Sequence, residues 1–232
     1  MVFYLYFYQT MKIILFLFLA FLFIHPVKGQ TGRDIFLYET TFYFDQNGSP
    51  LTEAEFQNAL KENPAEFHMW DQIENDSVRV SRLIPKKEKL KVSYPDVFKS
   101  VEKITGSSLA GNPVIIIFYD YTNDLCSPAS SFNNWDTLRI RKDKRAADNL
   151  KRRIQQQYPN VIAYHFFEPG ITIEPSQLHK EYFFLDRDHY FRKGLFKTQA
   201  SCGSIAIIKP GGATIIHHGE TAVPVITSSL FE

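Results

Sequence analysis

Two continuous apolar runs constrain the fold of this chain more than any other feature of its sequence. They are Val114–Tyr119 and Val161–Phe167, and neither shows the strict alternation of a strand with one face in water. Such runs are typical of strands that are covered on both faces. Between them, residues 147–158 carry apolar side chains at helical spacing, and Pro159 ends that pattern. A strand, a helix and a second strand in this order favour parallel pairing through a crossover.

The flanking segments extend this pattern in both directions. The further elements expected here are helices over 96–104, 176–193 and 225–230, strands over 205–208 and 213–217, and a long irregular segment over 120–142. The turn 209–212 joins the last two strands, so that pair is antiparallel. The order predicts an α/β fold with three layers, αβα, around a mixed sheet of about four strands.

Residues 30–90 lack this regular succession of buried strands and helices and are expected to form a small α+β appendage. Strands are expected over 35–44 and 77–84, and Thr52-Glu53-Ala54-Glu55 is a capping box that opens a helix ending near Leu60. The polar run 85–89 is interpreted as a linker. The expected division is therefore a signal peptide over 1–29, the appendage over 30–90 and the main domain over 91–232.

The N-terminal segment indicates export. Met11-Lys12 is followed by the apolar run 13–24 and then by His25-Pro26-Val27-Lys28-Gly29, the pattern of a secretory signal that is cleaved before Gln30. In this interpretation Met11 is the true start. A membrane anchor is the alternative, because residues 2–8 are also apolar, but 13–24 alone is shorter than the ~20 residues of a spanning helix. The mature chain is expected in the periplasm or outside the cell, with no stable membrane span.

The charge balance excludes several classes of partner. The chain has 26 basic and 25 acidic residues, and cleavage removes only Lys12 and Lys28 from this count. A near-neutral chain has no electrostatic footprint for nucleic acid, so an unidentified protein is the partner we expect. No phosphate-binding loop or hydrolase motif is present, and no cofactor is expected. His217 and His218 are neighbours on a strand and would point to opposite faces, so no metal site is expected either.

The element order, with its closing hairpin, resembles the thioredoxin-like fold. Residues 115–126, IIIFYDYTNDLC, look like the thioredoxin strand that ends in F-W-x-x-W-C-x-x-C. Residues 202–220, CGSIAIIKPGGATIIHHGE, are similar to the closing hairpin of that family. The resemblance covers about residues 95–230 and implies a redox site at the end of the first strand.

The chain departs from that family's active-site pattern at two positions. The first cysteine of C-x-x-C, the nucleophile, falls on Asn123, and the second falls on Cys126. The proline that faces the motif in a cis peptide bond falls on Gly203, where a cis bond would cost about 2.5–4 kcal/mol. In the peroxiredoxin pattern P-x-x-x-T-x-x-C, Tyr119 and Asn123 replace the proline and threonine. A standard disulfide oxidoreductase is therefore disfavoured.

Cys126 and Cys202 are the chain's two cysteines, and three uses of them remain open. In an oxidising compartment they form a structural disulfide, act as a redox pair, or stay free and inert. In the redox hypothesis Cys126 is the nucleophile, Cys202 is the resolving thiol, and Asn123 and Ser127 donate hydrogen bonds locally. Ser127-Pro128 would begin a helix whose dipole lowers the thiol pKa of Cys126. The alternative is a catalytically silent scaffold that the two cysteines lock.

Overall fold

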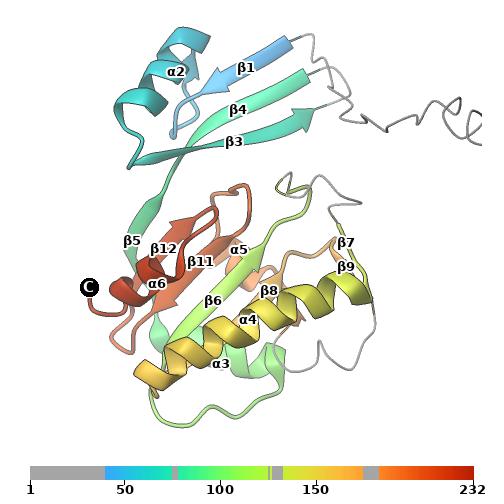
Figure 1. Cartoon of the computed structure of the whole chain (residues 1–232), viewed down its shortest axis with the longest axis vertical. Helices are drawn as coiled ribbons and strands as arrows, with labels where there is room; N and C mark the ends of the chain where they lie inside the picture. Colours follow the sequence, from blue (N-terminus) through green and yellow to red (C-terminus); the bar gives the residue numbers. More distant parts are fainter. Residues whose placement is uncertain (1–39, 75–77, 125, 127–132, 175–182) are drawn as a thin grey trace, which may run out of the picture. The chain divides into compact units, whose positions relative to one another are not determined.

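A computed structural model describes residues 40–74, 78–124, 126, 133–174 and 183–232 (Figure 1). The expected signal peptide and its cleavage point lie outside these residues. The described strands form a four-stranded sheet in the order β2-β1-β4-β3 and a six-stranded sheet in the order β10-β8-β6-β11-β12-β5. A short separate pair consists of β7 (Asn134–Trp135) and β9 (Thr172–Ile173). Among the described residues no helix combines the length and the apolar character that crossing a bilayer requires.

The smaller sheet confirms the predicted capping box. Its elements are β1 (Thr40–Phe44), β2 (Pro50–Leu51), α2 (Glu53–Glu62), β3 (Phe67–Glu74) and β4 (Val78–Pro85). The amide of Glu55 donates to the hydroxyl of Thr52, and the amide of Thr52 donates to the carboxylate of Glu55. Buried Phe56 then packs on Tyr43 of β1, with 5.0 Å between ring centroids. Strand β3 was not predicted, because its sequence FHMWDQIE does not alternate between apolar and polar residues.

The six-stranded sheet contains the predicted core and extends it at both edges. Its strands are β5 (Lys87–Lys91), β6 (Val114–Asp120), β8 (Val161–Phe167), β10 (Phe183–Leu185), β11 (Ser204–Ile208) and β12 (Ala213–His218). Strand β6 is parallel to β8 and antiparallel to β11, which forms the predicted hairpin with β12. Strand β5 pairs with β12, and β10 pairs with β8.

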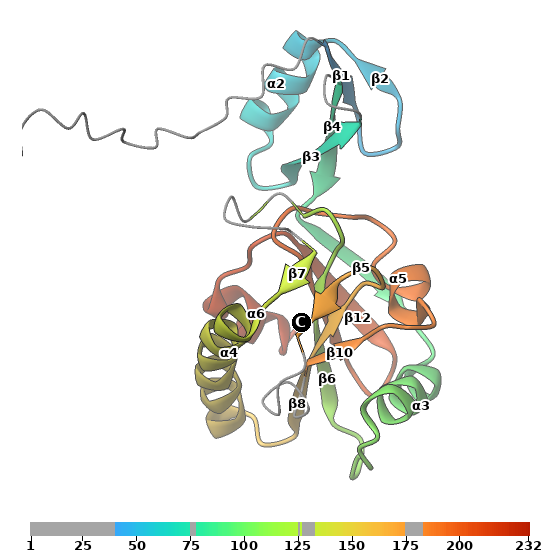
Figure 2. The ribbon, with the colours of Figure 1, turned by 90° about the vertical axis from the view of Figure 1, so that its right-hand side faces the viewer.

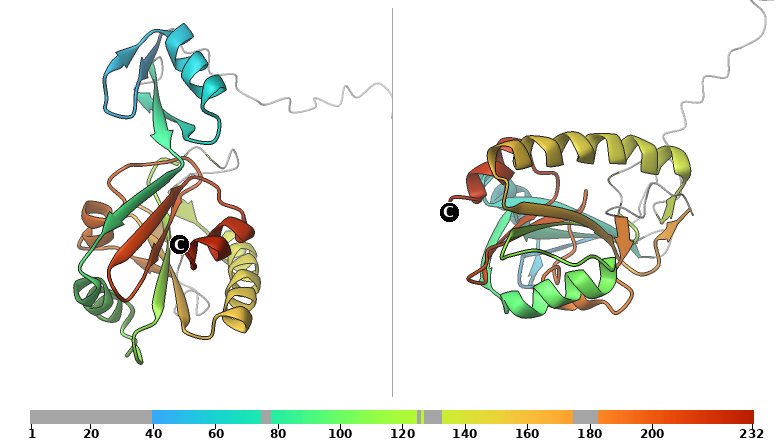
Figure 3. Two further views of the ribbon diagram at one scale, coloured as in Figure 1. Left: turned by 90° about the vertical axis from the view of Figure 1, so that its left-hand side faces the viewer. Right: turned by 90° about the horizontal axis from the view of Figure 1, so that it is seen from below.

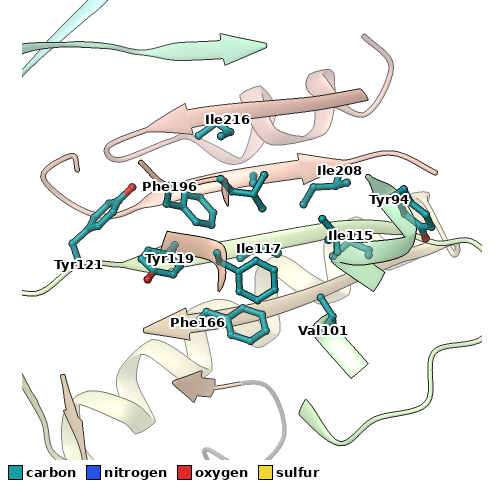
Figure 4. Packing of buried hydrophobic residues seen from close by; sticks show 14 residues of the cluster. Tyr94, Val101, Ile115, Ile117, Tyr119, Tyr121, Phe166, Phe196, Ile208 and Ile216 are labelled. Atoms are coloured by element: carbon teal, nitrogen blue, oxygen red, sulfur yellow. The ribbon is translucent and has the colours of Figure 1, made fainter. Parts of the chain in front are cut away.

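Helices cover both faces of this sheet (Figures 2 and 3). The helices of this part are α3 (Tyr94–Thr105), α4 (Thr137–Gln157), α5 (Tyr190–Gly194) and α6 (Val223–Ser229). Val101 of α3 packs in one cluster with Ile115 and Ile117, whereas Ile116 packs on the other face with Ile154 of α4. Alternate residues of β6 thus face opposite layers, and Figure 4 shows the first cluster. Each fully buried isoleucine contributes about 1.5–3 kcal/mol to stability.

The arrangement is thioredoxin-like. Its central strands have the order β8-β6-β11-β12, β11 runs antiparallel to both neighbours, and α3 lies on the sheet face opposite α4 (Figure 3). The α/β, three-layer prediction is confirmed, and β5 and β10 bring the mixed sheet from the expected four strands to six.

Three local predictions are wrong. The segment interpreted as a linker contributes β5, because Lys87–Lys91 satisfies the free edge of β12. Of the helix expected over 176–193, the described part contains β10 and the five-residue α5, while 175–182 lie outside the described residues. Helix α4 was expected from residue 147 but begins at Thr137, where Asp136 caps it. The sequence pattern missed this start because the first turns carry mostly charged side chains, which hide the apolar spacing.

Candidate functional site

The register of the sheet brings the two cysteines together. Ser204, the first residue of β11, pairs with Tyr119 near the end of β6, so the segments that hold Cys126 and Cys202 meet at one edge. The two residues form a disulfide with 4.8 Å between their Cα atoms. The end of β6 and the start of β11 therefore lie side by side. Cys126 is exposed and Cys202 is half-buried, so one sulfur of the bridge belongs to a residue at the surface.

Asp124 holds both cysteine segments, and the sequence did not predict it. Its Oδ1 accepts from the amides of Cys126 (2.9 Å) and Cys202 (3.0 Å), and its Oδ2 accepts from the amide of Gly203 (2.9 Å). Burial raises the pKa of this carboxyl, although the three donated hydrogen bonds oppose that rise. The available signal was its place two residues before a cysteine, where Asp commonly accepts from a following amide.

Gly203 occupies a position that a side chain does not fit. Its φ is +73°, and a Cβ built on it would lie 2.7 Å from the carbonyl oxygen of Tyr119. Cys202 also has a positive φ, +67°, and the described residues contain no cis peptide bond. The segment that carries the cis-proline in thioredoxins therefore approaches the end of β6 here through a left-handed glycine.

Asn123 fills the position of the thioredoxin nucleophile with a structural contact. Its backbone is left-handed, with φ +57°. Its amide donates to Oδ1 of Asn133 (2.7 Å), and Nδ2 of Asn133 donates to Oδ1 of Asn123 (2.8 Å). The side chain of Asn123 is thus an acceptor for Asn133. Ser127, the other expected donor, and Pro128 lie outside the described residues, as does the helix expected to begin there.

The disulfide opens into a cleft of about 820 Å³. Both cysteines and Asp124 line it, and so do Asp120, the last residue of β6, and His165 of β8. The carboxylate of Asp120 contacts Nε2 of His165 directly. A volume of this size is typical of a site for a small molecule or a few residues of a peptide.

The start of α4 supplies another wall of the cleft. Trp135 is buried, and the guanidinium of Arg139 stacks over its ring, 3.8 Å from the centroid. Asp143 follows one turn later, and burial raises the pKa of its carboxyl, while His165 and Arg139 oppose that rise. Sequence analysis did not single out these residues, because their roles depend on where α4 begins.

The histidines of the hairpin are used structurally. Nε2 of His217 lies 2.8 Å from the hydroxyl of Ser229 on α6, whereas Nδ1 of His218 lies 3.2 Å from the hydroxyl of Ser204. The two rings have separate partners, as expected for neighbours on a strand. Within the described part of the chain, no three histidine, cysteine or acidic residues gather as metal ligands.

Comparisons with known proteins find only a weak structural likeness. No protein-family model matches the chain, and no curated protein matches its sequence. Among solved structures, the chain is similar to a secreted Mycobacterium tuberculosis disulfide oxidoreductase described as homologous to E. coli DsbE, with a TM-score of 0.29 and 6% identity. The match covers 51% of this chain and 81% of that one. A likeness of this size says nothing about chemistry, so the site is interpreted from its own residues.

Proposed function

We propose that this is an exported thioredoxin-like protein whose Cys126–Cys202 disulfide exchanges with the thiols of a protein partner. The observation that carries the proposal is the place of the disulfide: exposed Cys126 lies on the wall of a cleft large enough for a peptide segment. Thiol–disulfide exchange requires that a thiolate reach one sulfur of the bridge. The protein is thereby a non-classical member of its fold, since Asn123 replaces the usual nucleophile.

The exchange follows from the pair's geometry. A partner thiolate attacks Sγ of Cys126, a bond forms between those sulfurs, the Cys126–Cys202 bond breaks, and the electron pair leaves on Sγ of Cys202, which takes a proton from water. A second thiolate of the partner then attacks the partner's sulfur in the mixed disulfide, the bond to Cys126 breaks, and Sγ of Cys126 leaves with the electron pair and takes a proton from water. The partner is oxidised to a disulfide and the pair is reduced to two thiols; in the reverse direction Cys126 is the nucleophile and Cys202 the resolving thiol.

Asp124 supports cycling over a purely structural bridge. Because its carboxylate binds the amides of Cys126 and of the 202–203 segment, these backbones stay close when the bridge is open. A structural bridge would need no second tie between the same segments. The silent scaffold remains the second candidate, and the engagement of Asn123 with Asn133 favours it, because that position is occupied by a structural contact.

The midpoint potential of the pair distinguishes the two candidates. We expect a potential above about −300 mV, in the range where thiol pools reduce disulfides, whereas a locked structural bridge lies below that value. The measurement is equilibration of the purified mature chain with graded dithiothreitol or glutathione buffers, followed by thiol counting. A potential below the stated limit would assign the protein to the silent scaffold.

A trapping experiment identifies the attacking sulfur. Cys202→Ser leaves Cys126 without its resolving thiol, so it should accumulate mixed disulfides with partner proteins on non-reducing gels. Cys126→Ser is the matched control, since both variants lose the same bridge, worth about 4 kcal/mol for a loop of this length (sequence separation 76). Equal trapping by both variants would overturn the assignment of Cys126. Sequencing the exported chain tests the proposed cleavage before Gln30.

A further inference from the structure

The cleft beside the disulfide follows one side of α4. The lining residues that α4 contributes are at positions 138, 139, 142, 143, 146, 147 and 150. Residues three and four positions apart share one side of a helix. From Leu138 to Leu150 that side is about 18 Å long at 1.5 Å per residue, a length that about five residues of extended chain would cover. A small thiol would leave most of this length empty.

The cleft also exposes apolar side chains. Leu138 is 76% exposed, the largest fraction among the large apolar side chains of the described residues. An isolated exposed leucine is ordinary on a protein surface. Leu138 is not isolated, because Phe118, Leu150 and Val223 line the same cleft. Apolar side chains on a concave surface are typical of a site that binds apolar groups.

The charge of the lining is mainly negative. Among the described residues five acids and two bases line the cleft: Asp120, Asp124, Asp136, Asp143 and Glu220 against Arg139 and Lys142. Even when a protonated His165 balances Asp120, the acids outnumber the bases. Arg139 offers little of its charge to a ligand, because its guanidinium lies on the ring of Trp135 and its Nη1 is buried. A cleft focuses the field of the charges that line it, so a positive group is favoured here.

This charge constrains the thiol that exchanges with the bridge. The attacking species is a thiolate, and the negative lining opposes its approach to Sγ of Cys126. A basic residue next to the attacking cysteine offsets that repulsion, and it also increases the thiolate fraction by lowering the thiol pKa. An acidic neighbour of the attacking cysteine would have the opposite effect on both.

We propose that the cleft binds an extended segment of a protein partner in which an apolar and a basic residue flank the reactive cysteine. The apolar side chain contacts the wall that contains Leu138, and the basic side chain faces the acids of the lining. The inference rests on the exchange reaction proposed above and names its substrate class, a basic and apolar cysteine segment of a protein rather than a small thiol.

The test compares thiols as reductants of the disulfide in the purified mature chain. The probes are the capped tripeptides Leu-Cys-Lys, Leu-Cys-Glu and Ser-Cys-Lys, with cysteamine as the small cationic thiol. Each rate is divided by the rate of the same thiol with hydroxyethyl disulfide, which cancels differences in thiol pKa. Leu-Cys-Lys should exceed Leu-Cys-Glu about tenfold, and Ser-Cys-Lys and cysteamine about threefold. Salt at about 0.5 M should shrink the first ratio and preserve the second, because salt screens charges.

Two exposed residues of the lining can be substituted with little effect on folding. Leu138→Gln should slow Leu-Cys-Lys about threefold and leave Ser-Cys-Lys unchanged, because only the leucine peptide loses an apolar contact. Glu220→Gln should slow Leu-Cys-Lys about twofold and speed Leu-Cys-Glu. The matched controls are Val225→Gln on α6 and Asp96→Asn on α3, exposed residues that do not line the cleft. Both controls should leave every rate ratio at the wild-type value.

The outcomes separate this inference from the exchange function itself. The inference is overturned if Leu-Cys-Glu reacts as fast as Leu-Cys-Lys, if cysteamine matches Leu-Cys-Lys, or if Val225→Gln slows Leu-Cys-Lys as much as Leu138→Gln does. Brisk reduction with no preference among the thiols likewise overturns only the inference. If no thiol reduces the bridge faster than it reduces hydroxyethyl disulfide, the exchange function fails as well.

Discussion

At both ends of the hairpin formed by β11 and β12, a left-handed glycine lies close to a backbone carbonyl, but the surroundings of the two glycines differ. The cysteine end (residues 121–126 and 201–204) and the turn end (residues 209–212 with Val92) each contain a glycine with positive φ, Gly203 at +73° and Gly212 at +81°. In both, an added Cβ would meet a backbone carbonyl oxygen, that of Tyr119 or of Val92. Close packing of the chain is therefore a shared requirement of the fold.

Of the two, the cysteine end adds a half-buried carboxylate, a disulfide with one exposed residue and a lined cleft. The turn end has backbone hydrogen bonds instead: the amide of Gly212 donates to Lys209 (2.7 Å) and the amide of Val92 donates to Gly212 (2.9 Å). Burial raises the pKa of the Asp124 carboxyl against the effect of its three hydrogen bonds, and an ionisable group with a perturbed pKa is typical of a functional site. The carboxylate, the disulfide and the cleft are therefore features that the hairpin does not require in order to fold.

The largest effect on stability is expected from substituting the two glycines, and the midpoint potential of the disulfide then distinguishes the two ends. Gly212→Ala should lower the free energy of unfolding by about 3–5 kcal/mol, because the left-handed backbone disfavours a side chain and the methyl group would overlap the carbonyl of Val92. Chemical denaturation of the oxidised chain measures this loss, and the midpoint potential of the disulfide should stay unchanged.

Gly203→Ala is the counterpart at the cysteine end. It should cost about 2–4 kcal/mol for the same reasons, and it should also shift the midpoint potential, because it displaces an amide that binds Asp124. Should both alanine variants leave the potential at the wild-type value, the cysteine end would be no more than a second structural turn.

A middle-sized effect is expected from Asp124→Asn. The amide side chain keeps one oxygen but presents an NH₂ group where the other oxygen accepted, so at least one of three hydrogen bonds is lost, at about 1–3 kcal/mol of stability. The two thiols of the reduced chain should then re-form their bridge more slowly, which a stopped-flow oxidation with excess oxidised glutathione measures. Asp136→Asn, which alters the cap of α4 instead, is the control; unchanged oxidation rates in Asp124→Asn would remove its role in positioning the cysteines.

The same contrast explains what the sequence could and could not predict. Strands β6, β8 and β11 were predicted closely because long apolar runs have few alternatives once both faces are covered. The pairing of Cys126 with Cys202 was permitted by the thioredoxin-like order and confirmed by the register of Ser204 with Tyr119. Both follow from patterns that extend over many residues.

The rest of the site depends on single contacts between distant segments. Asp124 matters because the 202–203 segment approaches it 78 and 79 residues later in the chain, and no local pattern encodes that meeting. Arg139 was one of many basic residues over 139–153, and only the early start of α4 turns it toward Trp135. Strand β5 was missed because KEKLK is an edge strand, where charged residues are typical and apolar alternation is weak.

The smallest expected effect is on the pH dependence of stability, which we expect to depend on His217 near the cysteine end and not on the turn end. Burial lowers the pKa of His217 below the usual histidine value of 6.5, and the neighbouring Lys87 acts in the same direction. The folded chain therefore binds this proton less readily than the unfolded chain. The contribution of His217 to the free energy of unfolding is present above pH 6.5 and is lost as the pH falls from 6.5 toward the folded pKa.

His217→Gln removes the titrating group near the cysteine end while its amide can still reach the hydroxyl of Ser229. Its stability should vary less with pH over this window than that of the wild type, as measured by urea denaturation at pH 7.5 and 5.5, whereas Lys209→Gln at the turn end should leave the wild-type dependence intact. A His217→Gln variant that loses as much stability on acidification as the wild type would show that the pH response of the fold originates elsewhere in the molecule.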